Sequence, residues 1–336
     1  MKLAVVEGDG IGSEVISEAV KVLDALSLPI EKVPVELGYG KWERTGNAIT
    51  DEDLDILKNC DCILFGAITT PPDPEYKSVL LTIRKELDMY ANIRPVKPLA
   101  GITGVTGRSD FNYVIVRENT EGLYSGIEEI HEDVAYTTRV VTRKGSKRIA
   151  EYACKLAKMR HNDVTIVHKS NVMKSDKLFL DVCQQTAEPE DVDYNDTLVD
   201  AMAYYLMTYP ERYDVVVTTN LFGDILSDMS AAHVGGLGLM PSANIGDKHA
   251  FFEPVHGSAP DIAGEGIANP VAAILSVKMM LQWYGYSKEA FLVEMGVNYT
   301  LNQGIKTPDL GGTATTRELG DGVIDYIKSQ LELESE

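Results

Sequence analysis

Two carboxylates stand four residues apart in the segment T-N-L-F-G-D-I-L-S-D, at Asp224 and Asp228. The segment directly follows an apolar, strand-like run, and on a helix this spacing places both side chains on one face. Two unpaired like charges so close together cost stability unless a cation lies between them. Ligands that offer only oxygen favour Mg²⁺ or Mn²⁺. We therefore predict a metal site here, with a solvated acidic face as the alternative.

Three arginines could hold a substrate that carries several carboxylates. Arg84 stands near the end of a helical segment, Arg94 lies in A-N-I-R-P-V, and Arg117 ends an apolar run. The planar guanidinium group binds a carboxylate through two parallel hydrogen bonds. Arg117 is the most informative of the three, because strands of open α/β sheets end at the ligand crevice. Each arginine alone also fits a surface salt bridge.

Tyr124 and Lys169 are candidates for moving protons. Lys169 comes just after the strand-like run 164–167, at the end of the strand where ligands bind. A partly desolvated lysine near a cation titrates low enough to act as a base, and a tyrosine can pass on a proton. Taken singly, the two residues also fit an ordinary surface lysine and a half-buried tyrosine.

The glycine-rich segment G-D-G-I-G, residues 8–12, follows one strand and opens one helix. It lacks the third glycine of the dinucleotide fingerprint G-x-G-x-x-G. The pattern therefore predicts a tight turn near a ligand, and it gives no reason to expect a Rossmann phosphate cradle.

These residues have to be positioned by an α/β fold, because short apolar runs alternate with helical patterns along the chain. Thr315 and Glu318 have the spacing of a capping box at the start of the last helix. A chain of this length without a linker suggests two domains with a cleft between them. The expected strands lie at 3–6, 62–65, 113–116, 164–167 and 215–217, and the expected helices at 13–26, 78–89, 145–159, 198–208, 268–284 and 316–331.

Composition excludes several other functions. The 336 residues carry a formal net charge of −20, which argues against nucleic acid as a partner. No run approaches the roughly 18 apolar residues of a membrane span, so no membrane association is expected. The four cysteines show no C-x-x-C spacing, and the start of the chain does not look like a signal peptide, so we expect a cytoplasmic protein.

An ordered set of motifs covers nearly the whole chain and resembles the β-decarboxylating dehydrogenases of isocitrate, isopropylmalate, homoisocitrate and tartrate. Each motif alone is modest evidence, whereas their shared order and spacing are specific. The motifs are G-D-G-I-G, L-F-G-A, Y-A-N-I-R-P, V-R-E-N-T-E-G-L-Y, H-K-S-N-V, V-D-A-M-A, T-N-L-F-G-D-I-L-S-D and F-E-P-V-H-G-S-A-P-D-I-A-G-E-G-I-A-N-P.

The resemblance implies a role for each candidate. The three arginines would bind the malate-like carboxylates of a hydroxy di- or tricarboxylate, and Asp224 and Asp228 would bind the metal. Asp200 would complete the metal site from a partner subunit. Lys169, also from the partner and with Asn171 close to it, would remove the hydroxyl proton, and Tyr124 would protonate the enolate. The implied unit is a homodimer that shares its active sites, with a tetramer left open.

The resemblance also implies a cofactor site along the loop 256–269. Asp261 and Ile262 occupy the positions that read the adenosine ribose, where a carboxylate accepts hydrogen bonds from free hydroxyls and repels a 2′-phosphate. NAD is therefore the implied cofactor, with a simple loop cap as the alternative for Asp261. The candidate cofactor residues are Ile11, Thr69, His256, Gly257, Ser258, Ala259, Asp261, Ile262 and Asn269.

Substrate choice is expected to depend on the segment Y-K-S-V-L-L-T-I-R before Arg84. Lys77 could pair with an additional distal carboxylate. Ser78 is shared with isocitrate enzymes, and Leu80 with Leu81 would suit an isopropyl group. The segment also resembles archaeal homoisocitrate dehydrogenases of the 2-oxoacid elongation pathway toward coenzyme B. We therefore expect homoisocitrate and longer homologues, with 3-isopropylmalate of leucine synthesis as the alternative.

The implied fold is a two-domain, non-Rossmann α/β fold with one large mixed sheet and an interdomain cleft. One domain would comprise residues 1–95 plus 236–336 and bind the cofactor. The other would comprise residues 96–235, carry the metal, substrate and dimer contacts, and include an arm at about 124–139. A hypothesis of another class is a non-catalytic protein that binds metal and polycarboxylates, but such a protein would be expected to lose Tyr124 or Lys169.

Overall fold

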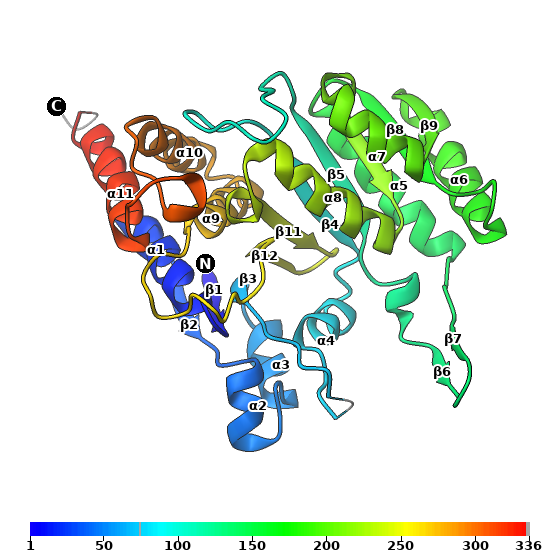
Figure 1. Ribbon diagram of the computed structural model, residues 1–336, viewed down its shortest axis with the longest axis horizontal. Coiled ribbons are helices and arrows are strands. Elements are labelled where there is room, and N and C mark those ends of the chain that lie inside the picture. Colours follow the sequence, from blue (N-terminus) through cyan, green and yellow to red (C-terminus); the bar gives the residue numbers. More distant parts are fainter. Residues whose placement is uncertain (74, 334–336) are drawn as a thin grey trace.

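A computed structural model describes residues 1–73 and 75–333, and its centre is a single ten-stranded mixed sheet (Figure 1). The strand order is β2-β1-β3-β12-β11-β4-β5-β10-β8-β9. The strands are β1 (Lys2–Gly8), β2 (Glu31–Pro34), β3 (Cys62–Ala67), β4 (Ala91–Val96), β5 (Tyr113–Glu118), β8 (Asp163–His168), β9 (Asp193–Leu198), β10 (Val215–Thr218), β11 (Pro241–Ile245) and β12 (Ala250–Pro254).

The described helices surround this sheet. The two helices α5 and α8 both pack against β5, while α9 packs against β11 and β12. The helices are α1 (Gly12–Ala25), α2 (Tyr39–Thr45), α3 (Asp51–Lys58), α4 (Val79–Glu86), α5 (Arg143–Lys158), α6 (Lys174–Ala187), α7 (Val199–Thr208), α8 (Asn220–Val234), α9 (Val271–Trp283), α10 (Ser287–Asn302) and α11 (Thr316–Leu333).

The two halves of the sheet run in opposite directions. Strands β2, β1, β3 and β12 are parallel to one another, and so are β5, β10, β8 and β9. Two antiparallel pairings of β11 and one of β4 with β5 reverse the direction between these sets. The strands of the two sets therefore point in opposite directions within one sheet, and the two sets meet at β11 and β4.

The predicted strands and helices are confirmed, with small differences at their ends. The predicted capping box is also present: Thr315 N–H donates to Glu318 Oε2 at 2.8 Å, and Glu318 N–H donates to Thr315 Oγ1 at 3.1 Å. The predicted mixed sheet is confirmed as well. The division into domains at residues 96 and 236 stays a prediction; the first boundary would fall at the last residue of β4 and the second between α8 and β11.

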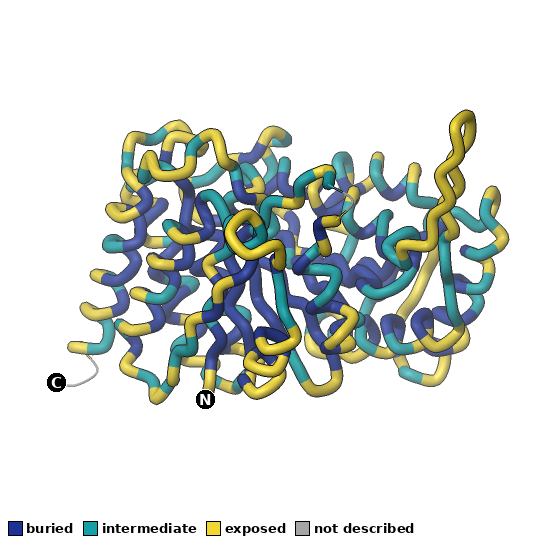
Figure 2. The backbone as a smooth tube through the Cα atoms, turned by 90° about the horizontal axis from the view of Figure 1, so that it is seen from below, coloured by how far each residue is buried: buried dark blue, intermediate teal, exposed yellow. Residues whose placement is uncertain are grey.

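A two-stranded hairpin leaves the body of the protein where the sequence predicts an arm. It pairs β6 (Glu128–Ile130) with β7 (Ala135–Thr137), and its strands are exposed over their whole length (Figure 2). Several of its exposed side chains are large and apolar, among them Ile130 and Tyr136.

The strands are buried on both faces in the middle of the sheet, as their apolar runs predict. Among the described residues, no helix has both the length and the hydrophobicity that a membrane crossing needs.

Candidate functional site

The two aspartates of α8 face the arginines that the sequence singles out. Arg117 forms a short ion pair with Asp224, and Arg94 Nη1 lies 3.3 Å from Asp224 and 3.2 Å from Asp228. The Tyr124 hydroxyl donates to Asp224 Oδ2 at 2.9 Å, and Arg117 Nη2 donates to Asn220 Oδ1 at 2.8 Å. One cluster therefore unites two candidate substrate arginines, the candidate proton donor and two candidate metal ligands.

The two aspartates are paired within the chain, and whether they also bind a metal stays a prediction. Arg94 contacts both of them, so guanidinium groups already balance much of their charge. The side chain of Asp228 is nevertheless 54% exposed, and each carboxylate oxygen has more than one lone pair to offer. Ile225 beside them is exposed, whereas Leu226 is buried.

Arg84 joins this cluster from the other half of the sheet. Its Nη2 donates to Glu253 Oε1 on β12 at 3.1 Å, and both side chains are buried. Asn244 on β11 donates to the same oxygen at 2.8 Å. The three arginines therefore span the boundary between the two halves, with Arg84 held by one and Arg94 and Arg117 held beside α8. This is the arrangement that a ligand with several carboxylates needs.

Burial and neighbouring charges shift the acidities in the cluster. Burial, with the repulsion of Arg94 added, lowers the pKa of Arg117 to about 10, so the guanidinium group stays charged near neutral pH. Burial favours the neutral form of Asp224, but Arg117 and Arg94 outweigh it and lower the pKa of this carboxyl. Burial, followed by the charge of Asp224, raises the pKa of Tyr124, which keeps its hydroxyl protonated. A protonated tyrosine is suited to donate a proton.

Lys169 and Asp200 form a separate pair within the chain. They follow β8 and β9, and their charged atoms lie 2.5 Å apart. Asn171 is exposed beside them. Among the described residues, no hydrogen bond or ion pair joins this pair to Asp224 or Asp228, and no group of three potential ligands forms a metal site in the single chain.

Arg139 and Asp176 connect Lys169 to the start of α8, and neither was predicted from the sequence as a site residue. Asp176 is fully buried; it accepts the Lys169 backbone N–H at 2.6 Å and lies 2.5 Å from Arg139 Nη1. Arg139, at the root of the hairpin, also donates to Thr219 Oγ1 at 2.9 Å, just before α8. Only an acidic residue in the first turn of α6 could have hinted at this link, and many such residues merely stabilise a helix start.

The candidate cofactor residues converge where β1, β3 and β12 end, on the loop that begins just after Glu253, the partner of Arg84. The backbone N–H of Ile11 donates to Ser258 O at 2.9 Å, and the hydroxyls of Thr69 and Ser258 lie 2.7 Å apart. Gly10 has a φ of +57°, and a Cβ there would lie 2.0 Å from Ser258 O, so this position requires glycine. The predicted tight turn is thus confirmed, and it packs directly under the loop.

The rest of the loop presents both buried and exposed groups. His256 Nε2 is buried without a hydrogen-bond partner among the described residues, and burial lowers the pKa of this imidazole. Ala259 and Ile262 are half-buried, whereas Gly257 and Asp261 are exposed. Asn269 is buried and donates to Asp309 Oδ2 at 3.0 Å. The exposed carboxylate and the unpartnered imidazole leave groups with which a nucleotide could bond.

The candidate specificity residues surround the start of α4. Ser78 caps this helix by accepting the Leu81 N–H at 3.4 Å, which gives its hydroxyl a structural role. Lys77 is exposed, and Leu80 and Leu81 are half-buried. Lys85 on the same helix donates to the carbonyl of Ser125, directly after Tyr124, so α4 lies beside the arginine and aspartate cluster.

Comparison with known proteins agrees with this arrangement. The family model described as isocitrate/isopropylmalate dehydrogenase matches residues 2–323. The chain belongs to this family. As a member of the isocitrate/isopropylmalate dehydrogenase family, it is a β-decarboxylating dehydrogenase, and the expectation drawn from its motifs is confirmed.

Members of the family with different names are similarly close to this chain. Homoisocitrate dehydrogenase of Methanocaldococcus jannaschii is 46% identical, over 98% of this chain and 99% of its own length. The 3-isopropylmalate/3-methylmalate dehydrogenase of the same organism is 48% identical, with the same coverage. Among solved structures, isocitrate dehydrogenase from Methylococcus capsulatus has a TM-score of 0.93 at 41% identity, covering 97% of this chain and 99% of that one.

Proposed function

We propose that the chain oxidises the C2 hydroxyl of a 3-substituted malate with NAD and a divalent metal, and removes the β-carboxylate as CO₂. The preferred substrates are homoisocitrate and its longer homologues. The observation that supports this proposal most is the set of three buried arginines beside two aspartates and a protonated tyrosine. Few functions other than binding a polycarboxylate explain so many buried guanidinium groups in one place.

Substrate binding would replace ion pairs that the protein now makes with itself. Arg94 and Arg117 are held by aspartates in the chain alone, and substrate carboxylates would take over part of that role. Asp224 and Asp228 would then hold Mg²⁺ or Mn²⁺ together with Asp200 of the partner subunit. The metal, when bound, polarises the C2 hydroxyl and carboxylate of the substrate.

Two protein groups would move the protons. Lys169 of the partner subunit, with Asn171 near it, would take the proton from the C2 hydroxyl as hydride leaves C2 for NAD. Tyr124 would give its proton to C3 after the carbon–carbon bond to the β-carboxylate breaks. Its hydrogen bond to Asp224 and its raised pKa both keep that proton in place until it is needed.

NAD would lie along the loop 256–269, over Ile11 and Thr69. Asp261 supports NAD over NADP, because its exposed carboxylate would repel a 2′-phosphate. Ile262 beside it adds no cation that could bind such a phosphate. A cytoplasmic location agrees with the four cysteines, all of which are buried and unbridged.

A homodimer would bring Lys169 and Asp200 to the aspartates of the other subunit. Its contacts would include the hairpin and the exposed apolar side chains of α7 and α8, such as Tyr204 and Ile225, which are each 59% exposed. The need for a third metal ligand, absent from the described residues of one chain, points the same way.

The choice of substrate rests on the start of α4. Lys77 is exposed and free to pair with a distal carboxylate, which favours homoisocitrate. The half-buried Leu80 and Leu81 favour 3-isopropylmalate instead, so that substrate is the second candidate.

The test measures NAD reduction by the purified protein with Mg²⁺ and compares kcat/KM for homoisocitrate, 3-isopropylmalate and isocitrate. In Lys77→Glu, we expect kcat/KM for homoisocitrate to fall about 100-fold, while that for 3-isopropylmalate changes by less than about threefold; this ratio corresponds to roughly 2 kcal/mol. Lys328→Glu, an exposed lysine on α11, is the control. Preference for 3-isopropylmalate in the unchanged protein would overturn the homoisocitrate assignment, and no reaction with any of the acids would overturn the enzymatic proposal.

A further inference from the structure

A groove between α5 and α9 lies outside the site described above. Its volume is about 600 Å³, and its floor is formed by sheet residues such as Ile93, Ala243 and Phe252. That volume is within the range of small-molecule pockets. None of the candidate metal, substrate or cofactor residues lines it.

The walls of this groove present large apolar side chains to solvent. Met159 at the end of α5 is 69% exposed and Trp283 at the end of α9 is 44% exposed. Tyr152, Leu156 and Met279 line the groove between them and pack against the main core. Exposed apolar surface of this kind, concentrated in a concave place, is typical of a binding site.

The only charged side chains among the described residues that line the groove are cations, Lys155 and Arg160. Arg160 is partly engaged, because it donates to Asp214 and Asn112. Lys155 has no hydrogen bond or ion pair with any described residue. In a chain with a net charge of −20, a cationic rim on an apolar groove is unusual and complements an anion.

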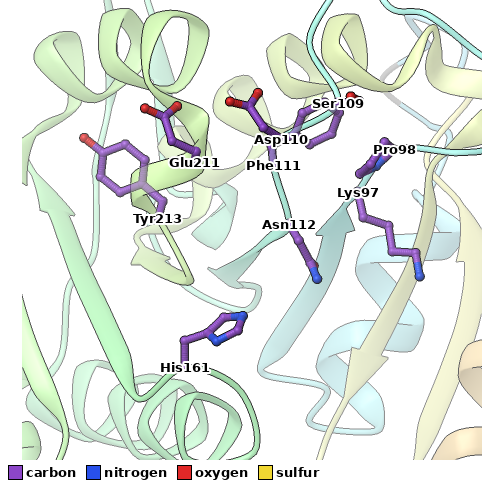
Figure 3. A pocket seen from close by; sticks show the side chains of 9 residues that line it. All are labelled: Lys97, Pro98, Ser109, Asp110, Phe111, Asn112, His161, Glu211 and Tyr213. Atoms are coloured by element: carbon purple, nitrogen blue, oxygen red, sulfur yellow. The ribbon is translucent and has the colours of Figure 1, made fainter.

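A second hollow, lined in part by His161, differs from the groove in the charges of its lining residues. It has about 500 Å³ and brings together Lys97, Asp110, His161 and Glu211, as Figure 3 shows. Its lysine forms an ion pair with Glu294, and its two acids contact Arg108. Charges of both signs that are already paired give that hollow no preference for an anion.

We propose that the groove between α5 and α9 binds a small amphipathic carboxylate with an unbranched aliphatic body of about eight carbons. The body would lie on Trp283, Met279 and Leu156, and the carboxylate would pair with Lys155 at the rim. A neighbouring hollow shares Lys155 and Trp283 with the groove and adds Arg148, Glu151 and Asp247, so the charged side chains that line it are of both signs. The site is independent of the proposed catalytic function.

The test is calorimetric titration of the whole protein with sodium octanoate. One site per chain is expected, with binding weakened about tenfold or more in Lys155→Glu and by less than about twofold in Lys144→Glu, an exposed position on the same helix. Acetate, which lacks the apolar body, should not bind there. Octanoate should also change the tryptophan fluorescence of the unchanged protein, and Trp283→Phe should remove that change.

Three results would overturn the proposal. The first is the absence of binding at millimolar octanoate, and the second is equal affinity in Lys155→Glu and Lys144→Glu. The third is displacement of octanoate by 3-isopropylmalate or homoisocitrate with Mg²⁺, since this would place octanoate on the arginine cluster. Failure of the catalytic proposal would leave the octanoate result unaffected.

Discussion

Replacing Asp176 by asparagine tests the link between the hairpin root and Lys169. The carboxylate now has two partners: it accepts a hydrogen bond from the Lys169 backbone at 2.6 Å and forms an ion pair with Arg139 at 2.5 Å. An amide of the same size has one accepting oxygen, so if that oxygen keeps the Lys169 bond, the NH₂ group must face the guanidinium group. Asp176 is fully buried and the side chain of Arg139 is only 13% exposed, so the remaining charge would be poorly solvated.

Removing one member of a buried ion pair costs roughly 3–5 kcal/mol. Arg139 keeps hydroxyl partners at Ser175 and Thr219, so we expect the lower end, about 3 kcal/mol. The matched control is Asp181→Asn on the same helix, where the carboxylate pairs with Lys177 at the surface and should contribute at most about 1 kcal/mol.

The assay is urea unfolding at one fixed protein concentration, together with kcat for the best substrate. Asp176→Asn should lower both the unfolding midpoint and kcat, whereas Asp181→Asn should change neither appreciably. Equal midpoints for the two variants would refute the buried-pair argument. A lowered midpoint with unchanged kcat would show that the contact stabilises the fold without positioning Lys169.

Three further predictions concern the metal, the cofactor and pH. Dialysis against EDTA should abolish activity, and Mn²⁺ should restore it. Asp228→Asn should raise the Mn²⁺ concentration that gives half-activation at least about tenfold. Activity that survives chelation would contradict the metal proposal. Asp261→Lys with Ile262→Tyr should reverse the preference for NAD over NADP in kcat/KM, and an unchanged ratio would rule out this loop as the reader of the ribose. Burial favours the neutral form of Glu294, but pairing with Lys97 and Lys278 outweighs burial and lowers the pKa of this carboxyl below its ordinary 4.5. The ionised carboxylate therefore stabilises the folded state above pH 4.5, and this stabilisation is lost as pH falls through the folded-state pKa. Glu294→Gln should therefore lower stability by about 2 kcal/mol at pH 7, and urea midpoints for variant and parent should converge as pH falls below 4.5.

The parts of the fold that the sequence predicts well are those with strong apolar patterns. Strands β3, β5 and β10 are buried on both faces and therefore read as uninterrupted apolar runs. Strand β9 was not predicted because its residues are mostly exposed at the sheet edge. Strand β4 was not predicted either, since Pro95 argues against a central strand, and only its pairing with both β5 and β11 shows its place.

The candidate site shows a similar limit. Arg84, Arg94 and Arg117 could be chosen from residue type and position, and they do come together. Their partners could not be chosen, because Glu253 lies 169 residues from Arg84 and Asn220 lies 103 residues from Arg117. Such pairs depend on the order of strands in the sheet, which local patterns do not determine.

The pairing of β4 with β5 bears on how a binding site can hold the common part of its substrates separately from the part that varies. Arg94 and Arg117 stand on these two neighbouring strands, where six consecutive residue pairs fix their spacing. In the proposed function, the part that every malate-like acid shares would therefore be held by two paired strands of the central sheet. The part that differs between acids would meet the start of α4. On this proposal, a few changes in the residues before α4 would alter the substrate without altering how Arg94 and Arg117 bind the common part. Relatives named for different acids could then remain similar throughout their length.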